Sequence, residues 1–305
     1  MGFELFDRYR EIIPDWPDFL ATLKSFQPRV LWTNTLRLSP QELQEILRQD
    51  GFDPQPLTWY SRAFRLPPDS RPGRTLAFLT GCFHVQEEVS LLPVFLLDPR
   101  PGERVLDLCA APGNKTLQAA MHMENRGSIF ANDKSVHRVG VMRRNIDRLG
   151  VSCISIATAD GANLPANCGP FDRVLVDVPC SCEGTTRRTP GVLDRPAAAG
   201  MRSSAQKALL RKAIQRCRPG GRIVYSTCTY APEENEVVVD AILRELEPGQ
   251  VDVLDARIEG FASLPGLPEW RGHSFDPRLE RTMRVYPHLN NTGGFYVAVL
   301  QKGMP

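Results

Sequence analysis

Asp177, Cys180 and Cys228 combine residue types and positions that suit nucleophilic chemistry. Asp177 and Cys180 follow an apolar run in residues 171–184 (FDRVLVDVPCSCEG), and Cys228 follows the run RIVYST. Such runs are typical of strands buried on both faces, and Pro179 cannot donate within a central sheet, so the first strand should end there. Ligands bind at the carboxyl ends of strands in open α/β sheets. A thiolate beside a carboxylate at that edge can act as a nucleophile, and nearby basic residues could lower its pKa.

Acidic residues end four successive predicted strands, at Asp107, Asp133, Asp160 and Asp177. A single Asp in such a place usually caps a helix, but four in succession exceed chance spacing. Asp133 ends the second strand, where a ribose would be bound. Residues 107–115 (DLCAAPGNK) form a tight loop whose N–H groups could hold a carboxylate or phosphate, yet they match neither a dinucleotide nor an NTP motif. A ligand with a ribose and a carboxylate but no phosphate fits S-adenosylmethionine.

A thiol beside a sulfonium methyl donor favours methyl transfer to a pyrimidine carbon. Carbon 5 of cytosine is a weak nucleophile by itself. Addition of a thiolate to carbon 6 makes the ring enamine-like, so that carbon 5 can attack the methyl group in line. Free cysteines are more often inert core residues, and we expect this of Cys153, Cys168 and Cys217.

The elements that must position these residues alternate between strand and helix from about Arg100. Predicted strands cover residues 103–110, 127–133, 152–160, 172–179 and 222–229, and predicted helices cover 115–123, 135–150, 203–216 and 233–246. The alternation predicts an α/β fold with a mostly parallel sheet and helices on both faces. Residues 251–256 and 284–302 predict antiparallel strands that finish the sheet, with a Gly293-Gly294 turn before an alternating strand.

The first 80 residues predict a small α+β module, and residues 81–305 the catalytic domain. Short amphipathic helices interrupted at Pro14 and Pro17 precede a strand at 30–38. Ser39, Pro40 and Glu42 then predict a capped helix that ends near Gly51. A second strand is predicted at 57–66, and PPDSRPG (67–73) predicts a loop before the next segment. Four residues in this module look exposed: Trp59, Tyr60, Arg62 and Arg65. They favour an RNA-contacting module or a structural appendage about equally.

Composition is that of an ordinary globular protein, with 42% hydrophobic and 24% charged residues in 305. The sequence shows neither a membrane-length apolar run nor a signal-peptide pattern, so we expect a cytoplasmic protein, and a monomer by default. Eight cysteines without a Cys-x-x-Cys pair, and five scattered histidines, predict reduced thiols and no metal site.

A local excess of positive charge follows the thiol segment. Between residues 183 and 222, two acidic residues stand against ten basic ones: Arg187, Arg188, Arg195, Arg202, Lys207, Arg211, Lys212, Arg216, Arg218 and Arg222. A solvated helix face is the commoner explanation of such a run. Its place beside the predicted site favours a polyanionic partner, namely nucleic acid.

Five motifs in order resemble those of the Nop/Sun-type RNA cytosine-5 methyltransferases, the RsmB/Nop family. They are DLCAAPGNKT, AND, TAD, DVPCSCEGT and YSTCT. The resemblance runs from about Arg29 to Lys302, since GCFHVQEEVSLL and RVYPHLNNTGGFYVAVLQK are similar to the segments that precede and close the family's sheet. It implies a Rossmann-like class I methyltransferase fold, the donor S-adenosylmethionine, and an RNA substrate, either rRNA or tRNA.

The resemblance also implies residue roles. Cys228 would be the nucleophile, and Cys180 would assist product release by helping to remove the carbon-5 proton or to break the thioether. Asp177 would hydrogen-bond the cytosine as charge develops. Asp133 would bind the ribose hydroxyls and Asp160 the adenine side. The methionine end of the cofactor would be held by the loop of Cys109, Ala110, Ala111, Pro112, Gly113, Asn114 and Lys115. Lys115, Arg187 and Arg188 are the expected RNA contacts.

Two residues depart from the family pattern. Asn114 stands where the loop commonly has Gly or another small residue, and Asn can adopt a positive φ at moderate cost, so cofactor binding should survive. Cys182 replaces the Gly expected after Pro-Cys-Ser, and a packing role is the favoured interpretation because free Cys is usually buried. Two other functions stay open: a DNA cytosine-5 methyltransferase, which would use the Pro-Cys thiol as nucleophile, and an RNA-binding assembly factor with this fold but no turnover.

Overall fold

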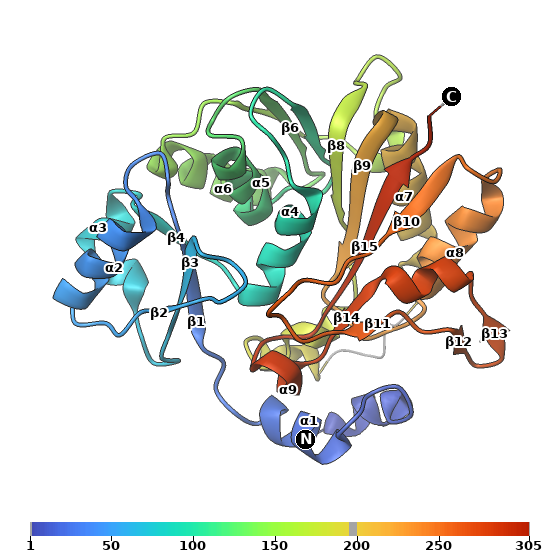
Figure 1. The fold of residues 1–305 in the computed structure, drawn as a ribbon, viewed down its shortest axis with the longest axis horizontal. Coiled ribbons are helices and arrows are strands. Elements are labelled where there is room, and N and C mark those ends of the chain that lie inside the picture. The colour runs from blue at the N-terminus through green and yellow to red at the C-terminus, as the bar shows by residue number, and fades with distance from the viewer. Residues whose placement is uncertain (1, 195–199, 305) are drawn as a thin grey trace.

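A computed structural model describes residues 2–194 and 200–304, and its centre is one nine-stranded sheet (Figure 1). The strand order is β11-β14-β15-β9-β8-β5-β6-β7, and β10 also pairs with β15. Five strands are parallel: β5 (Arg104–Asp107), β6 (Ser128–Asn132), β7 (Ile154–Ala157), β8 (Phe171–Asp177) and β9 (Cys217–Thr227). Four are antiparallel: β10 (Val251–Leu254), β11 (Leu264–Pro265), β14 (Met283–Val285) and β15 (Phe295–Lys302). The predicted α/β class is confirmed.

Helices cover both faces of this sheet because its strands are apolar on both sides. Val105, Leu175 and Val224 pack in the cluster that contains residues of α4 (Leu92–Leu97), α5 (Asn114–His122) and α6 (Val136–Leu149). Leu106 and Val176 pack in a second cluster, with residues of α7 (Ser203–Arg216) and α8 (Glu236–Glu245). The strand predicted before Pro179 ends at Asp177, as expected.

Strand β15 differs from the alternating strand that was predicted. Its first six residues, Phe295 to Leu300, are all buried. Phe295, Val297 and Val299 belong to one core cluster, and the intervening residues belong to the other. Both faces of this strand are therefore covered. Polar and apolar residues do not alternate along it because solvent reaches neither face. The Gly293-Gly294 segment follows a short helix, α9 (Pro287–Asn290), instead of forming a tight hairpin with β14.

A smaller four-stranded antiparallel sheet lies beside the central sheet, at the left of Figure 1. It has the order β2-β3-β1-β4, with β1 (Arg29–Thr33), β2 (Gln55–Pro56), β3 (Ala63–Leu66) and β4 (Phe83–Val85). Its helices are α2 (Pro40–Gln49) and α3 (Leu76–Leu79). The predicted Ser39–Glu42 capping box is present, whereas both predicted strands are shorter than expected. Because β4 pairs with β1, this sheet continues past residue 80.

Trp59 and Tyr60 are buried, which corrects the expectation that they are exposed. The two residues are 8% and 5% accessible. Both rings pack against Phe95, and Trp59 donates to Glu88 Oε1 at 3.1 Å. The two aromatic residues therefore fasten the small sheet to the rest of the chain, and an RNA contact through their faces is excluded.

Residues 3–23 pack on the part of the chain that contains the central sheet instead of on the small sheet. The 3₁₀ helix η1 (Phe3–Tyr9) and α1 (Trp16–Leu23) share a core cluster with Tyr230 and Tyr286. Figure 1 shows α1 beneath α9 and apart from the small sheet. Pro17 lies in the first turn of α1 and does not interrupt it.

The remaining short elements are η2 (Pro72–Arg74), η3 (Glu88–Leu91), η4 (Gly161–Asn163), η5 (Glu183–Thr185), η6 (Pro190–Val192), η7 (Pro277–Arg281), β12 (Glu269–Trp270) and β13 (His273–Ser274). Among the described residues, none of the helices has the length and apolar character needed to cross a membrane.

Candidate active site

The carboxyl ends of β8 and β9 bring the predicted acid and thiols together. Asp177 is paired with Ser226, and the Val178 N–H donates to the Ser226 carbonyl at 3.1 Å. Beyond Pro179 the chain crosses the end of β9, where the Gly184 N–H donates to the Cys228 carbonyl at 2.9 Å. A Cβ on Gly184 would lie 2.2 Å from the Gly294 carbonyl oxygen, so this crossing requires glycine.

The loop between β5 and α5 has the tight turn that its small residues predicted. Gly113 has φ 103° and precedes the first residue of α5, and a Cβ there would lie 2.6 Å from Met142 Cγ. Asn114 is helical, so the positive φ that it was expected to tolerate is taken by Gly113 instead. The Asn114 side chain bonds to His84 Nε2 at 3.0 Å. Because Arg148 donates to His84 Nδ1 at 2.7 Å, the ring must donate to Asn114 from Nε2.

A cavity of about 540 Å³ lies beside this loop, within the usual size of a cofactor site. Asp133 is 3% exposed and lines it. Its carboxylate accepts from the Ala111 N–H at 3.1 Å and the Ser135 N–H at 2.9 Å, and Arg138 Nη1 lies 3.4 Å away. A carboxylate has about four acceptor positions, so it retains capacity for ribose hydroxyls.

Asp160 also lines the cavity, with its carboxylate already engaged. It caps the helix η4 by accepting from the Ala162 N–H at 3.1 Å and from Asn163 Nδ2 at 2.7 Å. The opposite wall comes from α7 and includes Arg202, Gln206 and Leu209. Sequence reasoning placed Arg202 only in the basic run and assigned no role to Gln206 and Leu209, because only the fold brings these residues to the cavity.

Asp107 is a site residue to which the sequence assigned no role. Burial raises its pKa to about 7, against the hydrogen bond from Thr116 Oγ1 at 2.7 Å. Among the described residues its buried Oδ1 has no hydrogen-bond partner. A hollow of about 50 Å³ is lined by Asp107, Lys115, Asp177 and the loop residues between Cys109 and Asn114. An unpaired carboxylate oxygen there fits the ammonium group of the cofactor's methionine end.

Asp177 is held between a cation and a hydroxyl. Lys115 Nζ donates to Asp177 Oδ2 at 2.7 Å, and Ser226 Oγ donates to Oδ1 at 2.7 Å. Lys115 lies at the first turn of α5, and Asp177 at the end of β8. The two predicted site residues are therefore brought together, and the carboxylate has a fixed orientation.

Cys180 and Cys228 have their Sγ atoms 3.3 Å apart. Contacts with Cys182 and Cys228, and then burial, raise the pKa of Cys180 well above its ordinary value. For Cys228 the hydrogen bond with Cys180 lowers the pKa, but contact with Cys182 and burial outweigh it and leave the pKa well raised. The prediction that basic neighbours would lower these pKa values is wrong, because the neighbours that dominate are other thiols. Both sulfurs are thiols at neutral pH.

Cys182, for which the sequence favoured a packing role, lies beside the same pair. Its Sγ lies 4.0 Å from Cys180 Sγ, and its backbone has φ 64°. The side chain is half-buried instead of lying in the apolar core. The left-handed backbone turns it back toward the site.

Two buried glutamates, which the sequence did not reveal, hold the loop that carries these thiols. Glu183 Oε2 accepts from Tyr9 OH at 2.8 Å and from Thr229 Oγ1 at 2.9 Å. Glu234 Oε2 accepts from the Ser181 N–H at 2.9 Å and from its hydroxyl at 3.0 Å. Burial raises the pKa of both glutamates. The sequence signal for Glu183 was its place directly after Cys182 and three residues after Cys180.

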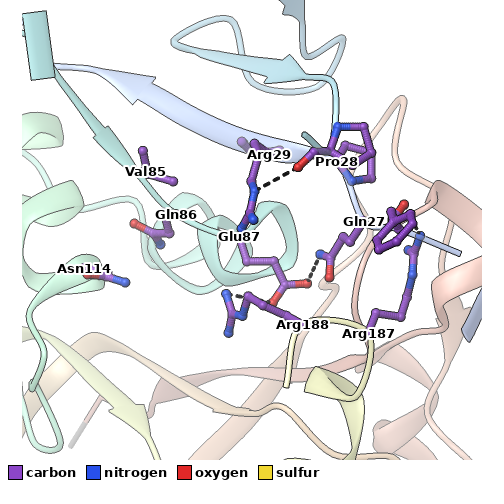
Figure 2. Close-up of a pocket in the computed structure, with 12 residues that line it drawn as sticks. Gln27, Pro28, Arg29, Val85, Gln86, Glu87, Asn114, Arg187 and Arg188 are labelled. Atoms are coloured by element: carbon purple, nitrogen blue, oxygen red, sulfur yellow. Dashed lines mark hydrogen bonds and ion pairs between the residues drawn. The ribbon is translucent and has the colours of Figure 1, made fainter. Parts of the chain in front are cut away.

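The expected RNA contacts Arg187 and Arg188 differ in accessibility. Arg187 donates to the Thr292 carbonyl at 2.7 Å and to Asn291 Oδ1 at 2.6 Å, so its donors are used within the chain. Arg188 is exposed and lies 3.6 Å from Glu87 Oε2. Figure 2 shows Arg188 at a hollow of about 200 Å³ that Asn114 of the cofactor loop also lines.

The basic run does not form one face at the site. Arg211 pairs with Glu245, Arg218 pairs with Asp172, and Arg222 donates to the Leu96 carbonyl. Arg218 and Arg222 lie in the first half of β9, away from Thr227. Arg195 lies outside the described residues.

Comparisons with known proteins match nearly the whole chain. A family model described as 16S rRNA methyltransferase RsmB/F matches residues 94–301, and one described as the N-terminal domain of 16S rRNA methyltransferase RsmF matches residues 4–88. A tRNA (cytosine(49)-C(5))-methyltransferase of Pyrococcus abyssi is 34% identical, covering 98% of this chain and 96% of its own length. A 28S rRNA (cytosine-C(5))-methyltransferase of Mus musculus is 36% identical over 99% of this chain, which spans 39% of that relative.

The fold is also found among solved structures. The crystal structure of a methyltransferase homolog from Pyrococcus horikoshii superposes with a TM-score of 0.82 and 29% identity. The match covers 99% of this chain and 100% of that one. The central sheet and the small N-terminal sheet are therefore both shared.

Proposed function

The chain belongs to the RsmB/F family of methyltransferases, and from that premise we propose that it methylates carbon 5 of a cytosine in RNA, rRNA or tRNA, through a covalent bond to Cys228. S-adenosylmethionine supplies an electrophilic methyl group. The observation that carries the covalent route is the approach of Cys228 Sγ and Cys180 Sγ to 3.3 Å at the strand edge that bears Asp177. A binding protein without turnover has no need of two thiols there.

Cys228 must lose its proton before its sulfur can add to carbon 6. The Asp177 charge is among the influences that raise the pKa of Cys228, after the contacts with the other thiols and burial. A cytosine that donates its amino group to Asp177 would offset part of that charge. Binding of the base thus favours the thiolate, so that the nucleophile forms where its target is already in place.

Asp177 positions the base, and Lys115 keeps the Asp177 carboxylate oriented. Its two hydrogen bonds, to Lys115 and Ser226, fix the plane of the carboxylate. Positive charge develops on the ring and its amino group when carbon 5 of the enamine-like adduct attacks the methyl group, and a preorganised acceptor stabilises that charge. Cys180 is then the group beside the reacting sulfur, and we assign it to product release. The base must be single-stranded or flipped to reach these thiols.

We place the RNA on the side of the cofactor loop where the small sheet meets the catalytic part. Phe26 is 86% exposed and lines the hollow of Figure 2 together with Arg29 and Arg188. An exposed aromatic ring can stack a base, and the two arginines that line the same hollow can contact its phosphates. The same hollow is lined by Asn114, next to Lys115. A nucleotide beside the target cytosine would therefore bind there.

The test uses RNA and labelled S-adenosylmethionine with wild type, Cys228→Ala, Cys180→Ala and the control Cys168→Ala, a half-buried cysteine outside the site. We expect no methyl transfer by Cys228→Ala, an accumulated protein–RNA adduct with Cys180→Ala, and wild-type turnover by the control. Methylation of RNA by Cys228→Ala would overturn the covalent route. Equal transfer to DNA of the same sequence, or RNA binding by wild type without any transfer, would favour the two other functions.

A further inference from the structure

Three thiols, two of them assigned to catalysis, form one compact cluster. The Sγ atoms of Cys180, Cys182 and Cys228 all lie within 4.8 Å of one another. In the part of the chain that the structure describes, this is the one group of three or more potential metal ligands found so close together. The expectation of no metal site rested on spacing along the sequence, and spacing cannot reveal Cys228, which the fold brings from the end of another strand.

The distances between these sulfurs are close to those between thiolates that share a metal ion. A Zn–S bond of about 2.3 Å places neighbouring sulfurs about 3.8 Å apart in tetrahedral geometry and about 4.0 Å apart in trigonal geometry. The distances from Cys180 Sγ are 3.3 Å to Cys228 and 4.0 Å to Cys182. The third separation, between Cys182 Sγ and Cys228 Sγ, is within 4.8 Å, so sulfur displacements of about 1 Å or less would bring all three sulfurs to a shared ion.

We propose that Cys180, Cys182 and Cys228 bind a thiophilic metal ion, with Zn(II) as the representative, and that this ion reversibly blocks methyl transfer. Thiolates select zinc and copper(I) over hard cations. Three thiols give up three protons to solvent as three metal–sulfur bonds form, which leaves one net negative charge on a Zn(II) complex. Arg202 Nη1, which donates to the Cys180 carbonyl at 3.3 Å, supplies a positive charge nearby.

The site is open, unlike a structural zinc site. Structural sites have four protein ligands, whereas three leave a coordination position for water or substrate. The loop is already held by the Glu183 and Glu234 hydrogen bonds, so the fold does not need the ion. Binding would occupy the sulfur of Cys228 that must attack the base.

Cys182 is the residue that converts a catalytic pair into a metal site. Its φ of 64° is a conformation for which Gly is best suited, yet the chain has a thiol there. Its Sγ contacts the Cys180 carbonyl at 3.4 Å and lies on the side of the other two sulfurs. The Cys182→Gly variant therefore removes one ligand and at the same time relieves backbone strain, so we expect it to fold.

The first experiment measures Zn(II) binding to the full chain, reduced with a phosphine, by competition with a chromophoric chelator. Cd(II) is used in parallel, because its thiolate complex absorbs in the ultraviolet. We expect one ion per wild-type chain and a loss of affinity in Cys182→Gly and Cys182→Ser. The loss should exceed the about 10–100-fold that removal of an outer-shell partner costs. The control Cys168→Ser should bind as wild type does. Equal affinity of wild type and Cys182→Gly would overturn the proposal.

The second experiment measures methyl transfer with increasing Zn(II), each rate relative to that of the same variant with chelator. We expect inhibition of wild type that the chelator reverses, and at least a tenfold higher inhibitory concentration for Cys182→Gly. Identical sensitivity of the two would contradict the blocking role. The inhibition experiment rests on the proposed function of Cys228, whereas the binding measurement does not. Failure of the metal site can therefore be told from failure of the proposed function.

Discussion

The reactive residues of this site are kept in forms that are inactive without ligands. Cys180 and Cys228 are protonated thiols in mutual contact, and Asp177 forms an ion pair with Lys115. Asp107 is buried with one unpaired oxygen. We expect the cofactor to pair with the free oxygen of Asp107 and the base to engage Asp177 and Cys228. We therefore expect that single substitutions can change cofactor affinity and the rate of methyl transfer independently.

Cofactor affinity should rise with pH through about 7 because Asp107 has its pKa raised to about 7 by burial. Below that pH the carboxyl is neutral and cannot pair with the ammonium group of the ligand, and above it the ionised form can. Calorimetric titration with S-adenosylhomocysteine between pH 6 and 8 measures this, with Asp107→Asn as the comparison. The variant should bind more weakly at pH 8 and lose most of the pH dependence. A flat affinity in wild type would refute the assignment.

Asp177→Asn should lower single-turnover methyl transfer by about 10²–10³, the usual effect of removing one preorganised electrostatic partner. The amide keeps the shape of the side chain but loses the charge that orients Lys115 and accepts from the base. Affinity for S-adenosylhomocysteine should change much less. Asp252→Asn, on the exposed side of β10, is the matched control. A rate within about threefold of wild type would remove Asp177 from the mechanism.

At the level of elements, the thiol loop is positioned by close backbone contacts that permit only glycine. Gly184 meets Gly294 where the segment after β8 crosses the end of β9 and precedes β15. The Gly294 N–H donates to the Gly184 carbonyl at 2.9 Å, so three segments far apart in sequence meet at one point. A shift there moves Cys180, Cys182 and Cys228 relative to one another.

Gly184→Ala should therefore lower both stability and activity. Its Cβ would lie 2.2 Å from the Gly294 oxygen, and overpacking of this kind costs about 1–3 kcal/mol. Thermal unfolding checks the stability and a methyl-transfer assay checks the displaced thiols. Gly191→Ala is the control, since its Cβ would meet nothing within 4 Å. Equal melting temperatures for the two variants would show that the crossing tolerates a side chain.

Sequence patterns predicted the sheet well because apolar runs and strand-end residues are local signals. The Ser39–Glu42 cap and the end of β8 before Pro179 are confirmed for that reason. Trp59 and Tyr60 were misjudged because their burial depends on Phe95, a residue of another segment. The clustering of Cys182 with Cys228 was not predicted for the same reason, because Cys228 is 46 residues further along the chain.

Across the whole molecule, the N-terminal residues and the small sheet form one side of the path proposed for RNA. Residues 3–23 pack on the catalytic part, and Arg187 ties Phe26 and Asn291 to the segment after the thiols. The hollow lined by Phe26, Arg29 and Arg188 lies at this junction. We therefore expect the junction, instead of the basic run along α7, to determine affinity for RNA.

Arg188→Gln should weaken RNA binding and reduce its dependence on salt. Loss of one phosphate contact lowers the slope of log affinity against log salt by about 0.7 for single strands. Phe26→Ala should weaken binding by about 1–3 kcal/mol through lost stacking, with little change in the slope. Arg211→Gln, whose guanidinium is paired with Glu245, and Leu79→Ala, which is 64% exposed, are the matched controls. If the controls and the variants behaved alike in a binding titration, the RNA would lie elsewhere.

The central claim is that Cys228 forms the bond to cytosine, and the most direct measurement is to locate that bond. RNA carrying 5-fluorocytosine should trap the adduct, because fluorine cannot leave as the carbon-5 proton does. After digestion, mass spectrometry of the peptides from wild type should place the nucleotide on Cys228, and Cys228→Ala should give no adduct. A nucleotide attached to Cys180, or an adduct that survives in Cys228→Ala, would contradict the account.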